Sequence, residues 1–145
     1  RRVLFRSPDT LLGMVRFCRD AGMEVLHVVT GTSPVGMKFE KTVKSLCGED
    51  VVIKTGLNSD MFLFHQLVKQ NRPDVIMGNT YCKYICGDMD IPLLRIGFPI
   101  YDRIGHSYVP VVGYRGGMHL LLKLLDLLMD RQDRDAPEEN VELIM

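Results

Sequence analysis

Side chains that could carry acid–base chemistry gather in one short stretch of the chain: Asp102, Arg103, His106 and Tyr108. A histidine close to a carboxylate can act as a general acid or base. The same stretch contains Pro99, Gly105 and Pro110, which favour an irregular loop. Its polar groups could therefore instead satisfy loop backbone or line a subunit interface.

The cysteines raise a second kind of chemistry, because thiolates bind metals. They stand at positions 18, 47, 82 and 86, and only the last two are close in sequence. A pair separated by three residues, with no third cysteine or histidine at ligand spacing, is a weak metal motif. We expect reduced thiols, with Cys82 and Cys86 packed near a turn.

Nucleotide-binding signatures are missing where they would be expected. The segment after the first strand lacks the Gly-x-Gly-x-x-Gly pattern that brings bare backbone to a pyrophosphate, and there is no Walker motif. The loop at residues 30–36 could hold an anion or be a plain turn. His27, His65 and His119 fit packed or exposed residues better than ligands, and Lys83 and Arg95 fit interface or surface charges.

Composition sets the limits for these interpretations. The chain has 145 residues, of which 46% are hydrophobic and 25% charged, as in one globular domain. Eighteen basic and eighteen acidic residues cancel, which argues against nucleic-acid or anionic-membrane binding. Lys123 and Asp126 interrupt the longest apolar stretch, so no membrane span is expected. We therefore expect a soluble protein.

The first seven residues resemble the translation of a common sequencing-library adapter. Residues 1–7 are therefore expected to be non-native, and the chain to be a fragment, although Val3–Phe5 could still serve as a first strand.

Beyond residue 7, strand-like and helix-like segments alternate. Short apolar runs predict strands at 24–30, 51–53, 74–77 and 91–96. Apolar residues at helical spacing, with capping and stop residues, predict helices from Thr10 to Gly22 and at 38–47, 61–70 and 117–130. The leucines at 120, 121, 124, 125 and 128 give the last helix a broad apolar face.

This alternation predicts the fold class. Strands and helices joined by short connections form parallel sheets with right-handed crossovers. We expect an α/β, Rossmann-like, doubly wound and mainly parallel sheet of about five strands, with helices on both faces. The domain should span residues 8–130. Residues 131–145 should form a charged tail with an apolar end that docks on a partner or on the domain.

Three ordered phrases now allow a comparison with a known family. They are Gly-Asn-Thr-Tyr-x-Lys-Tyr-Ile at 78–85, Pro-Leu-x-Arg-Ile-Gly-Phe-Pro-Ile-x-Asp-Arg at 92–103 and Gly-Tyr-x-Gly-Gly-Met at 113–118. Together they resemble the carboxy-terminal domain of the nitrogenase component 1 β chain. The resemblance runs from about residue 8 to the end. It is closest to β chains of alternative (vanadium or iron-only) or compact molybdenum–iron types.

The resemblance implies a subunit of a cytoplasmic α2β2 nitrogenase, which takes electrons from an ATP-driven iron protein and reduces dinitrogen to ammonia. It implies an iron–sulfur P-cluster between the α and β chains and an iron–sulfur substrate cofactor in the α chain. The β-chain ligands of the P-cluster belong to an amino-terminal part that this chain lacks. No ligand role is therefore transferred to its cysteines, and Cys82 departs from the glycine frequent in β chains.

The family pattern also bears on the candidate site. In an α chain, the histidine that ligates the cofactor should fall near Asp102 or Arg103, where this sequence has none. The β type is therefore favoured, and no catalytic, cofactor-binding or metal residue is expected. The motif and interface candidates are Asn79, Tyr81, Lys83, Arg95, Asp102, Arg103, His106 and Tyr114.

Alternatives remain open at this point. A cofactor-assembly scaffold, or a related dark-operative reductase of chlorophyll synthesis, would share this domain, and upstream cysteines would discriminate between them. A small-molecule or nucleotide-binding Rossmann module would be a protein of another class.

Overall fold

A five-stranded parallel sheet forms the centre of the first of two compact units, residues 1–106 and 107–145. The computed structural model describes residues 2–5, 8–32, 38–56 and 59–137. The strand order is β3-β2-β1-β4-β5. The strands are β1 (Arg2–Phe5), β2 (Val25–Thr30), β3 (Val52–Thr55), β4 (Val75–Gly78) and β5 (Leu93–Arg95).

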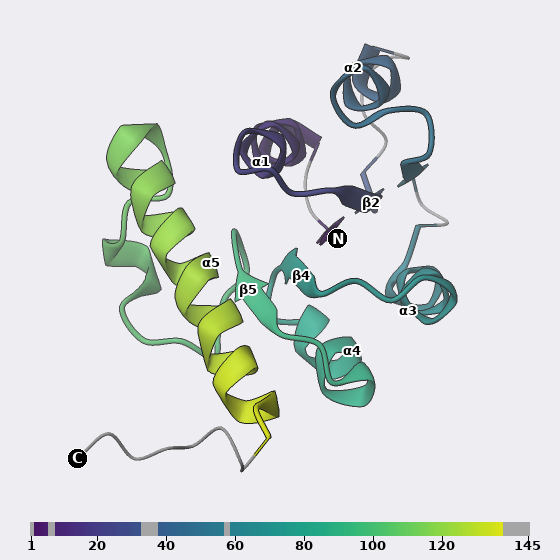
Figure 1. Ribbon diagram of the computed structural model, residues 1–145. Coiled ribbons are helices and arrows are strands. Elements are labelled where there is room, and N and C mark those ends of the chain that lie inside the picture. Colours follow the sequence, from purple (N-terminus) through teal and green to yellow (C-terminus); the bar gives the residue numbers. More distant parts are fainter. Residues whose placement is uncertain (1, 6–7, 33–37, 57–58, 138–145) are drawn as a thin grey trace, which may run out of the picture. The chain divides into compact units, whose positions relative to one another are not determined.

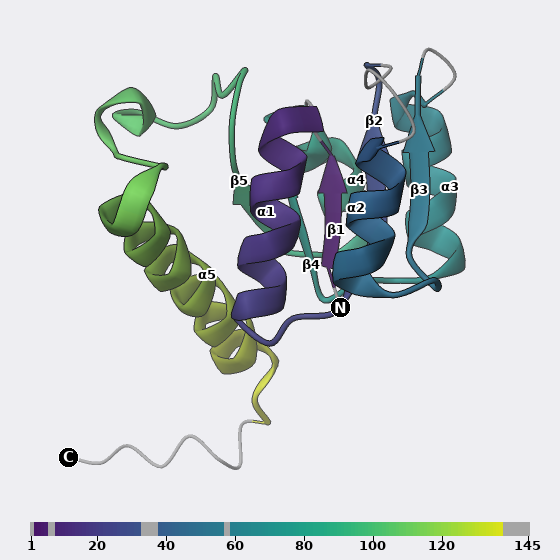
Figure 2. The same cartoon turned by 90° about the horizontal axis from the view of Figure 1, so that it is seen from above.

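The central strands read as continuous apolar runs because helices cover both faces of the sheet. Every residue of β2 and β4 is buried. Helices α1 (Pro8–Asp20) and α2 (Lys38–Cys47) lie on one face, and α3 (Met61–Gln70) and α4 (Cys82–Met89) lie on the other (Figure 1). The predicted Rossmann-like, doubly wound class is confirmed. Figure 2 shows the strands running in a common direction between the two helical layers.

The predicted bounds of α2 and α3 are confirmed, since capping residues and apolar spacing mark both helices. The Asp60 side chain accepts a hydrogen bond of 2.9 Å from the Leu63 amide, as an N-cap residue should. Other bounds differ from the prediction. Helix α1 begins at Pro8 rather than at Thr10, and the first position of a helix suits proline. Strand β5 is shorter than the expected 91–96.

One helix was not predicted. Cys82 and Cys86 lie one helical turn apart in α4, where Cys82 directly follows the turn at residues 80–81, and both are buried. They share a core cluster with Ile85, Phe64 of α3 and Ile76 of β4. The helix is only eight residues long and no side chain caps its first turn, so its sequence signal is weak.

The second unit contains α5 (Gly113–Asp135), which is longer than the expected helix at 117–130. It starts at a glycine four residues earlier and continues five residues into the segment expected to be a tail. A short 3-10 turn, η1 (His106–Tyr108), stands where the two units divide. The apolar chain end from Val141 lies outside the described residues, as does most of the loop at 30–36.

The strand at Arg2–Phe5 is the central one, paired with β2 and β4. The expectation that Val3–Phe5 could serve as a first strand is confirmed, whereas the adapter origin of residues 1–7 stays a prediction. Within the described part of the chain, no helix has both the length and the apolar character needed to cross a membrane.

Candidate functional site at the carboxyl ends of β4 and β5

The loops that follow β4 and β5 meet through a three-residue polar cluster. The Arg95 guanidinium donates to both oxygens of the Asp102 carboxylate: Nε lies 3.0 Å from each oxygen, and Nη2 lies 2.7 Å from Oδ2. The Thr80 hydroxyl donates a further hydrogen bond of 3.0 Å to Oδ1 of Asp102. Parallel strands bring these residues together because their carboxyl ends share one edge of the sheet. We call Thr80, Arg95 and Asp102 the loop anchor.

Backbone bonds extend the loop anchor. Thr80 Oγ1 accepts a hydrogen bond of 2.9 Å from the Tyr101 amide, and the Thr80 amide donates one of 3.1 Å to the carbonyl of Pro99. Pro99 follows a cis peptide bond, and Gly97 has a φ of 89°, a conformation that favours glycine. The phrase at residues 96–103 therefore encodes a turn that Thr80 and Arg95 hold.

Electrostatics at the loop anchor argue against acid–base chemistry by Asp102. The hydrogen bond from Arg95 holds the pKa of the Asp102 carboxyl far below its usual range, with a further contribution from Thr80. An aspartate so held stays ionised near neutral pH, and its oxygens are occupied by donors. A general base needs a pKa close to the working pH. Asp102 therefore fixes a loop.

Asn79 also has a local role. Its Oδ1 accepts a hydrogen bond of 3.1 Å from the Tyr81 amide and lies 3.9 Å from the Cys82 sulfur. The asparagine side chain thus satisfies backbone at the entrance to α4, a common use of this residue in turns. Asn79 is buried and does not face solvent.

Around the loop anchor, large apolar side chains are exposed. Phe98 is 77% exposed, Tyr101 71% and Ile104 fully exposed. Tyr81 and Tyr84 add exposed rings from the start of α4, where the Lys83 ammonium lies 5.1 Å from the centre of the Tyr84 ring. We call these five residues the aromatic rim. A group of exposed apolar side chains on an ordered loop is typical of an interaction surface.

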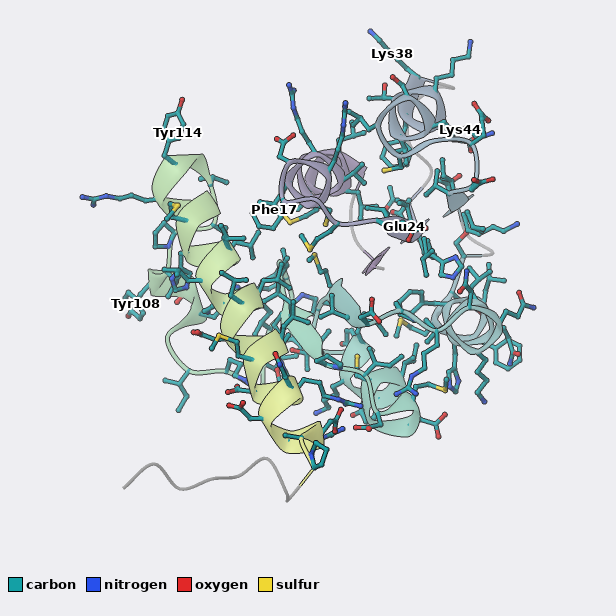
Figure 3. All side chains as sticks on the ribbon, viewed as in Figure 1. Phe17, Glu24, Lys38, Lys44, Tyr108 and Tyr114 are labelled. Atoms are coloured by element: carbon teal, nitrogen blue, oxygen red, sulfur yellow. The ribbon has the colours of Figure 1, made fainter. Side chains whose placement is uncertain are left out.

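The structure brings some of the predicted site residues together and separates others. Arg95 and Asp102 are directly paired, and Arg103 donates a hydrogen bond of 2.6 Å to the Asp102 carbonyl. His106 begins η1 and is half-buried. Tyr114 belongs to the second unit and projects away from the first turn of α5 (Figure 3). The roles assigned to the eight candidates stay predictions.

Sequence reasoning did not single out Thr80, although it lies inside the first quoted phrase. A hydroxyl directly after a buried strand is a usable signal, because such residues reach the neighbouring loop. Nor did it single out Phe98, Tyr101 and Ile104, since one sequence does not show which apolar residues remain exposed.

The cysteines show no ligand-like arrangement. Burial raises the pKa of both Cys82 and Cys86 to about 12, so these thiols are protonated at neutral pH. The Cys18 sulfur lies 3.7 Å from that of Met77 in the core. No three histidine, cysteine or carboxylate side chains gather at metal-binding distance in the described ranges. The described residues therefore do not fit an iron–sulfur cluster.

Comparison with known proteins identifies the family. The family model described as nitrogenase component 1 type oxidoreductase matches residues 1–129. The chain belongs to this family. It is 36% identical, over 97% of its length, to the nitrogenase molybdenum–iron protein β chain of Clostridium pasteurianum, and 33% identical over 94% to that of Frankia alni. The suspected family resemblance is thus confirmed.

A solved structure agrees with the sequence relatives. The chain superposes on a structure titled "Nitrogenase Cp1 at pH 6.5" with a TM-score of 0.90 and 35% identity, over 99% of this chain and 31% of the other. It likewise spans 31% of the Clostridium protein and 26% of the Frankia protein. The match therefore covers about a third or less of a nitrogenase component 1 chain.

Proposed function

We propose that this chain is the carboxy-terminal domain of the β subunit of nitrogenase component 1, the α2β2 protein that reduces dinitrogen to ammonia with electrons from the iron protein. The family match over residues 1–129 and the TM-score of 0.90 support this role. The relatives named above are molybdenum–iron β chains. We place the complex in the cytoplasm.

Within this complex we assign the domain a structural and subunit-contacting role. The carrying observation is the combination of an aromatic rim that faces solvent with a loop anchor whose charges are satisfied internally. Fixing the loop in advance lowers the entropy lost when a partner covers it. Tyr81 and Tyr101 also keep hydroxyl groups for polar contacts at the edge of such an interface.

Cofactor chemistry belongs, in this proposal, to other parts of the complex. The P-cluster at the α/β interface and the iron–sulfur substrate cofactor of the α chain would supply electron transfer and reduction. Because no three metal-binding side chains gather among the described residues, no step of that chemistry is assigned to this chain. Its residues instead contribute a rigid surround, which low-potential clusters require.

The experiment that tests this role uses the full-length β chain co-expressed with its α chain. Tyr101→Glu and Phe98→Glu each place a charge on the aromatic rim and leave the loop anchor intact. We expect at least about a tenfold loss of α-chain association, as for a central interface residue. Acetylene reduction per assembled complex should not change.

Phe62→Glu is the matched control, because Phe62 is 70% exposed on α3 and is not part of the aromatic rim. It should leave association unchanged. Normal assembly of both rim variants would contradict the contact role. Loss of activity in fully assembled rim variants would contradict a purely structural role for this loop.

A further inference from the structure

Two groups of exposed side chains make up the aromatic rim, and one buried threonine joins the loops that carry them. The first group follows β4 and consists of Tyr81 and Tyr84. The second follows β5 and consists of Phe98, Tyr101 and Ile104. Thr80 stands directly before the first group and is 5% exposed. A residue so placed acts on both groups without touching a partner itself.

Three hydrogen bonds cross from Thr80 to the second loop. Its Oγ1 donates one of 3.0 Å to Asp102 and accepts one of 2.9 Å from the Tyr101 amide. Its amide donates the third, of 3.1 Å, to the Pro99 carbonyl. A threonine hydroxyl has one donor hydrogen and accepts as well, so a single side chain makes both of the first two bonds. Thr80 therefore holds the second loop at three points between Pro99 and Asp102.

Each loop is also ordered on its own side of this junction. In the first loop, the Tyr81 amide donates to Asn79 Oδ1, and the Lys83 amide donates to the Thr80 carbonyl. In the second loop, Arg95 pairs with Asp102, and the two side chains are only 17% and 21% exposed. These bonds order each loop separately, whereas those of Thr80 fix one loop against the other.

The function of the junction follows from what the two loops carry. We propose that Thr80 is the positioning residue of the aromatic rim. Its hydroxyl holds the two groups of exposed side chains at one spacing, so that a partner meets both as a single rigid surface. Ordering a surface before contact lowers the conformational entropy that association costs. This inference deepens the proposed function, and it rests on that proposal only for the presence of a partner.

A positioning role differs from a purely stabilising role in what its loss does. If Thr80 only stabilised the fold, loss of its hydroxyl would weaken association to the same extent whichever rim side chains are present. If Thr80 acts through the rim, the same loss matters for association only while both groups are there to be aligned. The two roles therefore give different results in the absence of one group.

The first test follows amide hydrogen exchange in the full-length complex by mass spectrometry. Thr80→Val keeps the shape of the side chain but leaves the Tyr101 amide without its acceptor. Exchange in the segment 97–104 should therefore accelerate at least about tenfold, while exchange in β2 should not change. Thr80→Ser retains both a donor and an acceptor, so it should exchange at close to the parental rate. Parental exchange at 97–104 in Thr80→Val would overturn the proposal.

Thr30 offers a matched control at the same edge of the sheet. It ends β2, is 1% exposed, and its Oγ1 accepts a hydrogen bond of 3.2 Å from the Thr32 amide in its own loop. Thr30→Val should leave exchange at 97–104 at the parental rate. Equal acceleration by Thr30→Val and Thr80→Val would overturn the proposal, because the loss of any buried hydroxyl from this edge would then loosen the rim.

The second test measures association of the full-length β chain with its co-expressed α chain. Thr80→Val should weaken association several-fold, and Thr80→Ser should not. Phe98→Ala combined with Tyr101→Ala removes most of the second group, and in that background Thr80→Val should change association less than about twofold. A several-fold loss in both backgrounds would show a purely stabilising role and overturn the proposal.

The outcomes separate this inference from the proposed function. Normal assembly of Tyr101→Glu and Phe98→Glu would contradict the contact with the α chain, and the exchange test would still decide whether Thr80 fixes the two loops. Failed assembly of those two variants, together with parental association of Thr80→Val, would overturn the positioning role and leave the contact standing.

Discussion

At the residue scale, the same kinds of side chain have different roles according to their partners. Asp102 suggested acid–base chemistry in the sequence, but Arg95 and Thr80 occupy its oxygens and keep it ionised. His27 is the opposite case. It lies in the middle of β2, is 3% exposed, and neither ring nitrogen makes a well-formed hydrogen bond to a described residue. Asp102 stabilises a loop, whereas the buried His27 lowers the stability of the fold.

His27 predicts a pH dependence of stability. Burial lowers the pKa of His27 below 6.5, and the Asn71 backbone opposes the change in part. A histidine with a lowered folded pKa is tolerated above pH 6.5 and destabilises the fold as the pH falls below that value, because protonation is easier in the unfolded chain. The free energy of unfolding should therefore decrease from pH 7 to pH 5.

His27→Leu removes both the titration and the unsatisfied nitrogens. The variant should be more stable by about 1 kcal/mol at pH 7, with a larger gain at pH 5. Urea unfolding at both pH values measures this difference. Equal pH slopes for the variant and the parent would contradict the assignment to His27.

At the element scale, α5 shows that a hydrophobic pattern can predict a helix without showing which of its apolar residues are buried. Leucines at 120, 121, 124, 125 and 128 suggested one broad apolar face. Only Leu120 and Leu124 are buried, while Leu125 is 46% exposed. The periodicity therefore predicted a helix correctly but did not show which leucines are the most buried.

The difference between neighbouring leucines gives a prediction. Leu124 is 2% exposed, so Leu124→Asp buries an unpaired charge and should abolish soluble folding. Leu124→Ala, a milder change, should cost about 2–5 kcal/mol. Leu125→Asp is the control: it should leave the fold intact, because Leu125 is 46% exposed. Expression yield and thermal melting provide the measurements, and near-parental values for Leu124→Asp would contradict the burial of this position.

Two adjacent glycines at the start of α5 should respond in opposite directions. A Cβ at Gly116 would lie 2.4 Å from the backbone carbonyl carbon of Val111, whereas one at Gly117 would meet nothing within 4 Å. Gly116→Ala should therefore disrupt the first turn and lower the melting temperature. Gly117→Ala should raise stability by up to about 1 kcal/mol, the gain in helix propensity. Equal melting temperatures for the two variants would refute the close approach at Gly116.

At the scale of the whole molecule, the sheet order explains why distant residues meet. Strands β4 and β5 are neighbours, so Thr80 and Asp102 form a hydrogen bond although they are 22 residues apart. The same topology places Cys82 and Cys86 together in the core cluster. The function proposed above assigns iron ligation to other parts of the complex.

That assignment predicts the outcome of cysteine substitution in the full-length complex. Replacing Cys18, Cys47, Cys82 or Cys86 singly by Ala should leave the iron content per complex and the paramagnetic resonance signals of the clusters unchanged. Cys82→Ala and Cys86→Ala should lower stability modestly, because each leaves a small void in the core. Loss of iron from a variant that still folds and assembles would contradict this prediction.

The fold class, several helix bounds and the family of this protein follow from the sequence alone. Alternating apolar runs and helical spacing predicted the doubly wound class and the bounds of α2 and α3, because these signals are local and periodic. The family was recognised separately, from three short phrases whose order and spacing can be read directly from the sequence. The helix α4 was missed because eight residues without a side-chain cap carry little local signal.

Only the tertiary structure decided how the polar residues are used. The pairing of Arg95 with Asp102, the hydrogen bond from Thr80 to Asp102 and the exposure of the aromatic rim depend on which strands are neighbours. The unequal burial of Leu124 and Leu125 likewise depends on packing. Residue types and spacings specify local structure, whereas burial and partnership arise from contacts between segments far apart in the chain.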